Sequence, residues 1–151
     1  MEAKVRGYTY RSAVRWTGEK RGVCTTAGKP SIEVATPPEF KGHPGIWSPE
    51  DLFVSSVNAC VMMTFLSFAE RAGLPLAGYE SEAEGKLEFV DGGFQFTAVT
   101  VKPRVLLRAG ADPGKARELM DRAEKYCLVS RSVKSRVSVE ASIEEGTPGA
   151  A

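Results

Sequence analysis

Residues 48–73 read SPEDLFVSSVNACVMMTFLSFAERAG and predict a long helix at the centre of the fold. Ser48 is a typical capping residue, and Pro49 fits the first turn of a helix. Glu50 and Asp51 favour the positive end of the helix dipole. Gly73 then ends the helix, because glycine readily takes the left-handed conformation that follows a last turn.

The apolar side chains of this segment occupy every face of the predicted helix instead of one stripe. They are Leu52, Phe53, Val57, Cys60, Val61, Met63, Phe65, Leu66 and Phe68. A helix of this kind is buried on all sides. The remaining residues are too few to wrap it completely, so we expect a second copy of the chain to cover one face in an obligate homodimer.

The same segment has the length of a membrane span, because residues 52–69 carry no charge. Charged residues flank both ends of this stretch, however, and five residues within it are polar. The five polar residues are Ser55, Ser56, Asn58, Thr64 and Ser67. We therefore interpret the segment as a buried helix and expect no membrane association.

Composition narrows the class of protein further. The chain has 151 residues, with 20 Lys and Arg against 19 Asp and Glu, so it lacks the cationic surplus that nucleic-acid binding requires. Three cysteines without a C-x-x-C pair do not form a secreted disulfide framework, and the first 16 residues lack an apolar signal core. We expect one cytoplasmic domain over residues 1–145, followed by a flexible tail at 146–151.

Strand patterns surround the central helix. Residues 8–16 alternate in polarity as in a half-buried strand, and residues 23–26 and 31–36 predict two more. Residues 79–89 and 94–101 predict a hairpin around Asp91-Gly92-Gly93. A second, amphipathic helix begins at Asp112-Pro113, and residues 133–143 predict a last strand. This order indicates an α+β fold with a mostly antiparallel sheet.

The three cysteines are the main candidates for chemistry. Cys60 lies on the buried helix and Cys127 at the end of the amphipathic helix, so the two can meet in the core, although a buried cysteine commonly serves only as packing. Cys24 is interpreted as a packing residue. A reactive thiolate needs a nearby cation, and the candidates are Arg15, Lys20, Arg21 and Lys41.

Glu50 is a candidate for orienting that cation, although it equally suits a first-turn helix charge. It precedes Cys60 by ten residues, or about 15 Å along a helix, and therefore can only serve the site of a second copy.

Sequence motifs for other kinds of functional site are weak or missing. His43 is the only histidine, which leaves a zinc site or a Cys-His-Asn arrangement without support. No phosphate-binding glycine loop is present, and we expect neither a metal nor a cofactor.

Several motifs together resemble the OsmC/Ohr family. They are SPEDLF at 48–53, NAC at 58–60, YCLVS at 126–130, WTG at 16–18, FKG at 40–42 and VSVE at 137–140. The resemblance spans nearly the whole chain. It implies an intertwined homodimer, with mostly antiparallel sheets wrapped around central buried helices and with sites at the subunit interface.

The resemblance also implies an activity, that of a thiol peroxidase acting on organic hydroperoxides. Carried onto this sequence, Cys60 is the peroxidatic cysteine and Cys127 the resolving one, with a dithiol such as a dihydrolipoyl group as reductant. Glu50 matches the glutamate that holds an arginine beside the reactive sulfur. We expect Phe53, Met63 and Phe65 to supply apolar walls that favour alkyl hydroperoxides.

The arginine departs from the family pattern. In one branch it follows a Gly-Gly in the first hairpin, where residues 18–22 here read GEKRG, so Arg21 or Lys20 would take its place. In another branch it precedes the Phe-x-Gly of the loop, where this chain has Glu39. The alternative hypothesis is therefore a redox sensor or apolar-ligand-binding protein that has lost fast peroxide chemistry. A structural domain with two packed cysteines is the third hypothesis.

Overall fold

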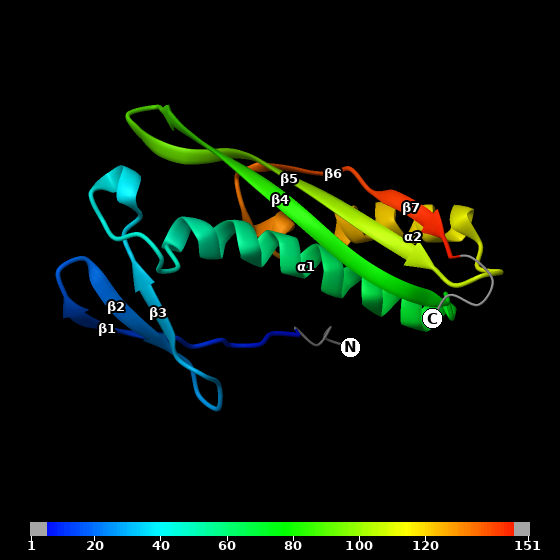
Figure 1. Cartoon of the computed structure of the whole chain (residues 1–151), viewed down its shortest axis with the longest axis horizontal. Helices are drawn as coiled ribbons and strands as arrows, with labels where there is room; N and C mark the ends of the chain where they lie inside the picture. Colours follow the sequence, from blue (N-terminus) through cyan, green and yellow to red (C-terminus); the bar gives the residue numbers. More distant parts are fainter. Residues whose placement is uncertain (1–5, 147–151) are drawn as a thin grey trace, which may run out of the picture. The chain divides into compact units, whose positions relative to one another are not determined.

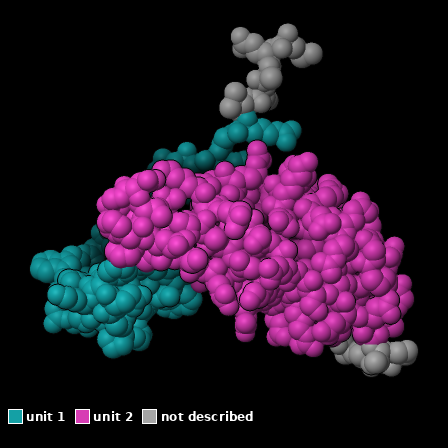
Figure 2. Space-filling view, turned by 90° about the horizontal axis from the view of Figure 1, so that it is seen from above, with its two compact units in different colours: residues 1–52 teal, residues 53–151 magenta. Residues whose placement is uncertain are grey.

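A computed structural model describes residues 6–146 (Figure 1). It divides the chain into two compact units, Met1–Leu52 and Phe53–Ala151 (Figure 2). Each unit is considered by itself. Residues 147–151, which hold most of the tail predicted from the sequence, lie outside the described part of the chain. The described Gly146 is tied to the sheet, because its N–H donates to the Leu107 carbonyl.

The first unit is built on a small antiparallel sheet of order β1-β2-β3. Its strands are β1 (Ala13–Gly18), β2 (Arg21–Thr25) and β3 (Ile32–Ala35), followed by the short 3-10 helix η1 (Pro38–Phe40). The predicted half-buried strand at 8–16 is wrong in two respects. Residues 7–12 form no strand, and Val14 and Trp16 on β1 are 70% and 75% exposed within the chain. The alternation marks two faces of a thin sheet, but this chain buries neither face of β1.

The long helix α1 (Pro49–Ala72) begins and ends where the sequence predicts. The Asp51 N–H donates to the Ser48 hydroxyl at 3.1 Å, and the Ser48 N–H donates to the Asp51 carboxylate at 2.9 Å. These reciprocal bonds satisfy N–H groups that have no partner inside the helix. Gly73 ends the helix with a φ of 65°.

The second unit contains the rest of α1 and a larger sheet. The hairpin of β4 (Leu76–Val90) and β5 (Gly93–Leu107) is longer than predicted, and α2 (Pro113–Tyr126) follows it, capped by Asp112. Next come the 3-10 helix η2 (Ser130–Ser132), β6 (Arg136–Val139) and β7 (Ser142–Glu145).

The last predicted strand, residues 133–143, is two strands in the structure. Both β6 and β7 pair with β5 in parallel, whereas the β4–β5 pairing is antiparallel. Parallel pairing follows from the connection, because a strand that returns through a crossover helix lies parallel to the strand before that helix. The α+β class is as predicted, with these two parallel strands at its C-terminal end.

The core of the second unit is formed by one stripe of α1 together with β5 and α2. The stripe consists of Val57, Val61, Phe65 and Ala69, four residues apart, and all four are buried. The buried partners are Val99, Val101, Val105, Leu107, Ala116, Leu119, Met120 and Ala123.

Other positions on α1 are only partly covered by the single chain, and Met63 is 57% exposed. The single chain therefore leaves part of α1 uncovered, and its burial by a second copy stays a prediction. By length and composition α1 is able to cross a membrane, but its stripe packs into the core of this unit instead.

Gly85 brings α1 close to β4. A Cβ at this position would lie 2.5 Å from Cγ2 of Val54 and 2.9 Å from the ring of Phe96. The Phe96 ring also stacks on Phe53 of α1, with 4.6 Å between ring centroids. The missing side chain thus lets the helix and the strand pack at short distance.

Replacing Phe65 by alanine tests the stripe. We expect the free energy of unfolding to fall by about 3–5 kcal/mol, because a fully buried aromatic ring leaves a cavity. Ser67→Ala, on the exposed side of the same helix, is the control and should change stability by less than about 0.5 kcal/mol. Urea unfolding at one protein concentration measures both, and equal effects would contradict the assigned core.

Candidate active site

Two of the three cysteines meet in the second unit. Cys60 is half-buried on α1, and Cys127 caps the C-terminus of α2, where its N–H donates to the Ala123 carbonyl at 2.9 Å. The Cys127 side chain is 0% exposed. Both are free thiols, and the Cys127 side chain is close enough to Cys60 to lower its pKa. Cys24 belongs to the first unit, in β2 opposite Val14 and Ile32.

The turn after Cys127 contributes two backbone donors to Cys60. The N–H groups of Leu128 and Val129 lie near its sulfur and lower the pKa of Cys60. They belong to the start of a helical turn, in which the Arg131 N–H donates to the Cys127 carbonyl and the Ser132 N–H to the Val129 carbonyl. The first N–H groups of such a turn have no acceptor inside it and are free to bind an anion.

Thr64 adds a polar contact to the Cys60 sulfur from α1 itself. Its hydroxyl oxygen lies 3.9 Å from the Cys60 sulfur and 2.7 Å from the Cys60 carbonyl oxygen, to which it donates. The sequence analysis did not assign Thr64 to the site. The available signal was its spacing, since residues four apart on a helix are neighbours on one face.

These contacts make Cys60 the more acidic thiol of the pair. Burial is the largest single influence and raises the pKa of Cys60. Hydrogen bonds from the Val129 N–H, the Cys127 thiol, the Thr64 hydroxyl and the Leu128 N–H together outweigh it. The net pKa of Cys60 is lower than that of an ordinary cysteine, which favours the nucleophilic thiolate.

Cys127 has the opposite tendency. Burial raises the pKa of Cys127, and the neighbouring Cys60 raises it further, while Ser130 acts in the other direction. Of the two adjacent thiols, Cys60 therefore ionises more readily than Cys127. Such a pair is able to form a disulfide after Cys60 has been oxidised.

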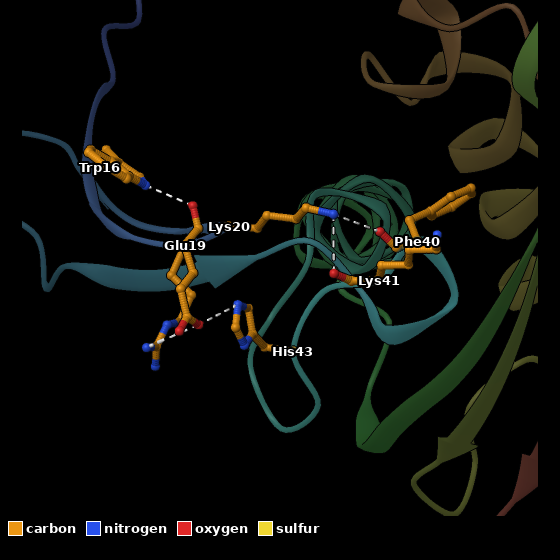
Figure 3. A network of polar contacts seen from close by, with 7 residues as sticks. Trp16, Glu19, Lys20, Phe40, Lys41 and His43 are labelled. Atoms are coloured by element: carbon orange, nitrogen blue, oxygen red, sulfur yellow. Dashed lines mark hydrogen bonds and ion pairs between the residues drawn. The ribbon is translucent and has the colours of Figure 1, made fainter.

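The predicted cations lie in the first unit, and two of them are already engaged there. The Arg21 guanidinium is 3.6 Å from a carboxylate oxygen of Glu19, and the Lys20 ammonium donates to the Phe40 and Lys41 carbonyls at 3.3 and 3.2 Å (Figure 3). Arg15 and Lys41 are exposed.

Glu50 lies in the same unit as Arg21. Its Oε2 atom is buried and has no hydrogen-bond partner within the described chain. The first unit therefore holds Glu50 and the cations, and the second holds the two cysteines.

The apolar walls predicted around the site are placed differently. Phe65 is fully buried in the core, where its ring lies 5.9 Å from that of Tyr79, and Phe53 stacks on Phe96. Only Met63 of the three is largely exposed. The helical period explains the error, because Phe65 is one position past the Cys60–Thr64 row and shares the buried stripe. Among residues 6–146, no group of three or more His, Cys, Asp or Glu side chains is placed to hold a metal ion.

The α+β fold thus places two neighbouring free thiols together. Cys60 on the long helix has a lowered pKa, and Cys127 has a raised one. The sequence pattern of the family described as OsmC-like protein matches residues 42–142, and the chain belongs to this family.

Relatives of known sequence support the same assignment. The chain is 27% identical over 137 residues to the uncharacterized protein YmaD of Bacillus subtilis, covering 87% of this chain and 91% of the relative. It is 25% identical over 135 residues to the peroxiredoxin OsmC of Escherichia coli, covering 86% and 93% respectively.

Solved structures share the fold. An OsmC-like protein of unknown function from Vibrio cholerae matches with a TM-score of 0.83 and 20% identity, covering 90% of this chain and all of that one. An organic hydroperoxide resistance protein, OsmC, from Legionella pneumophila matches with a TM-score of 0.71 and 24% identity, covering 91% and 97%.

The acidity of Cys60 is open to direct measurement. Alkylation requires the thiolate, so a lowered pKa shifts the rate profile toward lower pH. We expect the midpoint of Cys60 alkylation by iodoacetamide, followed by peptide mass spectrometry, to lie below that of the same peptide in urea-unfolded protein. A midpoint above the unfolded value would mean that burial prevails over the hydrogen bonds.

Thr64→Val removes one of the donors while keeping the side-chain shape. We expect the pKa of Cys60 to rise and its alkylation rate at pH 7 to fall roughly threefold, since less thiolate is stabilised. Thr64→Ser retains a hydroxyl and is the matched control. Equal rates in the valine and serine variants would exclude a contribution from this hydroxyl.

Proposed function

We propose that this chain is a thiol-dependent peroxidase that reduces organic hydroperoxides to alcohols. The observation that carries the proposal is the neighbouring pair of a half-exposed Cys60, with a lowered pKa, and a buried Cys127. The names of the relatives from Escherichia coli and Legionella pneumophila, peroxiredoxin and organic hydroperoxide resistance protein, agree with it.

The proposed chemistry has two steps. The Cys60 thiolate attacks one peroxide oxygen, the O–O bond breaks, and the other oxygen leaves as an alkoxide that takes up a proton to give the alcohol. The resulting sulfenic acid then condenses with the Cys127 thiol, so that water leaves and a disulfide forms. The two side chains are neighbours, since each influences the pKa of the other, and this proximity favours the second step.

A dithiol would restore the resting enzyme, and dihydrolipoyl groups are the reductant that the family resemblance suggests. One thiolate of the dithiol attacks the disulfide, and its second thiol releases the enzyme by forming the oxidised reductant. Cys60 is the sulfur that such a reductant reaches, because Cys127 is 0% exposed. A cytoplasmic location fits a cycle that depends on reduced thiols.

The proposed active form is an intertwined homodimer. Exposed apolar side chains are found in both units of the single chain, including Trp16, Met63 and Leu128. Burying them against a second copy follows from the hydrophobic effect. In the dimer, Glu50 and Arg21 of one copy would serve Cys60 of the other, as the distance along α1 requires.

Mass spectrometry after one equivalent of cumene hydroperoxide tests the function. We expect a loss of two hydrogens per chain and a peptide pair that links Cys60 to Cys127, with Cys24 still open to alkylation. Cys60→Ser should abolish peroxide consumption, whereas Cys127→Ser should stop at sulfenic acid and oxidise further to sulfinic acid in excess peroxide. Unimpaired turnover by Cys60→Ser would refute the proposal.

A second candidate function, a redox sensor or apolar-ligand-binding protein without fast peroxidase activity, is favoured by one observation. Arg21, the best match to the activating arginine, is paired with Glu19. A sensor would form the same disulfide slowly, so stopped-flow rates of Cys60 oxidation separate the two functions. A protein with purely structural cysteines would keep both thiols free under the same treatment.

A further inference from the structure

Glu19 stands at the centre of the charge network in the first unit. Its Oε2 atom is 3.6 Å from the Arg21 guanidinium and 3.2 Å from Nε2 of His43 (Figure 3). One carboxylate thus faces two basic side chains, one from its own hairpin and one from the loop that leads to α1. Glu19 is the residue that interrupts the Gly-Gly pattern of the first hairpin.

The backbone fixes the position of this carboxylate. Glu19 has a φ of 52°, in the left-handed region that side chains other than glycine rarely adopt. Its carbonyl accepts a 2.8 Å bond from the Trp16 indole, and the next carbonyl, that of Lys20, accepts a 3.1 Å bond from the Thr36 N–H. Lys20 is itself held by two carbonyls of the loop. The turn therefore presents Glu19 in a defined place.

Glu50, in the same unit, has a carboxylate oxygen without the basic partners that Glu19 has. Its buried Oε2 atom has no hydrogen-bond partner in the described chain, and a buried carboxylate oxygen is strongly stabilised by a cation. A hollow of about 520 Å³ is lined by Arg21, Gly22, Thr36 and Pro49, among others. It extends from Arg21 to the residue just before Glu50 and leaves room for a guanidinium to move.

Of Lys20 and Arg21, the two cations next to Glu19 in the hairpin turn, Arg21 is the one free to change partner. Lys20 is bound to two carbonyls, whereas Arg21 has a single long ion pair and a side chain that is 40% exposed. Arginine is also well suited to pair with the Glu50 carboxylate, because its planar guanidinium group binds a carboxylate through two parallel N–H bonds.

We propose that Glu19 is a positioning residue that holds Arg21 away from Glu50 and so limits the activation of Cys60. When Glu19 is replaced by an uncharged residue, Arg21 pairs with Glu50 and favours the Cys60 thiolate of a second copy. This inference rests on the proposed function for its biological meaning, and on the proposed dimer for the path from Arg21 to Cys60.

The charge-removing variant Glu19→Gln is the direct test, because it keeps the shape of a side chain that is 65% exposed. We expect Cys60 alkylation at pH 7, in the otherwise unchanged chain, to become about tenfold faster, the effect of one unit of pKa. Glu19→Asp keeps the charge and should restore the original rate. Circular dichroism and thermal unfolding establish that all variants are folded.

Two double variants identify the route. Glu19→Gln combined with Arg21→Ala should show no gain over Arg21→Ala alone, and Glu19→Gln combined with Glu50→Gln should show no gain over Glu50→Gln alone. A gain that persists without Arg21 or without Glu50, or no gain in Glu19→Gln, would overturn the inference.

Alkylation also separates this inference from the proposed function. The readout needs no peroxide turnover, so the transfer of Arg21 is judged even if the protein consumes no hydroperoxide. Conversely, a peroxidase whose Cys60 alkylation is indifferent to Glu19 would retain the proposed function and lose the positioning role.

Discussion

The packing of one helical stripe against a sheet is the constraint on which the second unit depends. Val57, Val61 and Phe65 of α1 lie in the same buried cluster as the inward side chains of β5 and α2. The stripe fixes the rotation of α1, because a helix turns by about 100° per residue and only one face can meet the sheet. Cys60 then lies beside the stripe instead of within it, half-exposed and turned toward the end of α2. Hydrophobic packing thus determines which sulfur is accessible.

The sequence was sufficient for the elements whose ends are set by local chemistry. Ser48 and Gly73 bound α1, Asp112 caps α2, and the turn at Asp91 and Gly92 has the positive φ angles that a tight hairpin requires. The meeting of Cys60 and Cys127 was also open to prediction, because each faces the core from one of the two long helices. The caps and the turn depend on residues close together in the chain, whereas the cysteine pair follows from the core-facing side of each helix.

Features that depend on distant partners were not predictable in the same way. Alternation identifies the two faces of a strand but not its neighbour, so the parallel pairing of β6 and β7 with β5 was missed. For β1 the alternation suggested a buried face that the single chain does not provide. The ion pair between Glu19 and Arg21 depends on a left-handed backbone at Glu19, which no propensity scale anticipates for glutamate. The donors from Leu128 and Val129 are main-chain groups and leave no trace in residue type.

The position of Cys127 at the end of α2 has a consequence for how the polypeptide matures. Cys24 and Cys60 are synthesised before Cys127, which is separated from Cys60 by the β4–β5 hairpin and α2. Pairing across such a separation is among the slower events of folding, because a long loop must close first. An oxidant that meets the unfinished chain finds Cys24 and Cys60 without their native surroundings and is able to link them to each other. Reducing conditions until α2 is docked therefore keep Cys24 and Cys60 as free thiols.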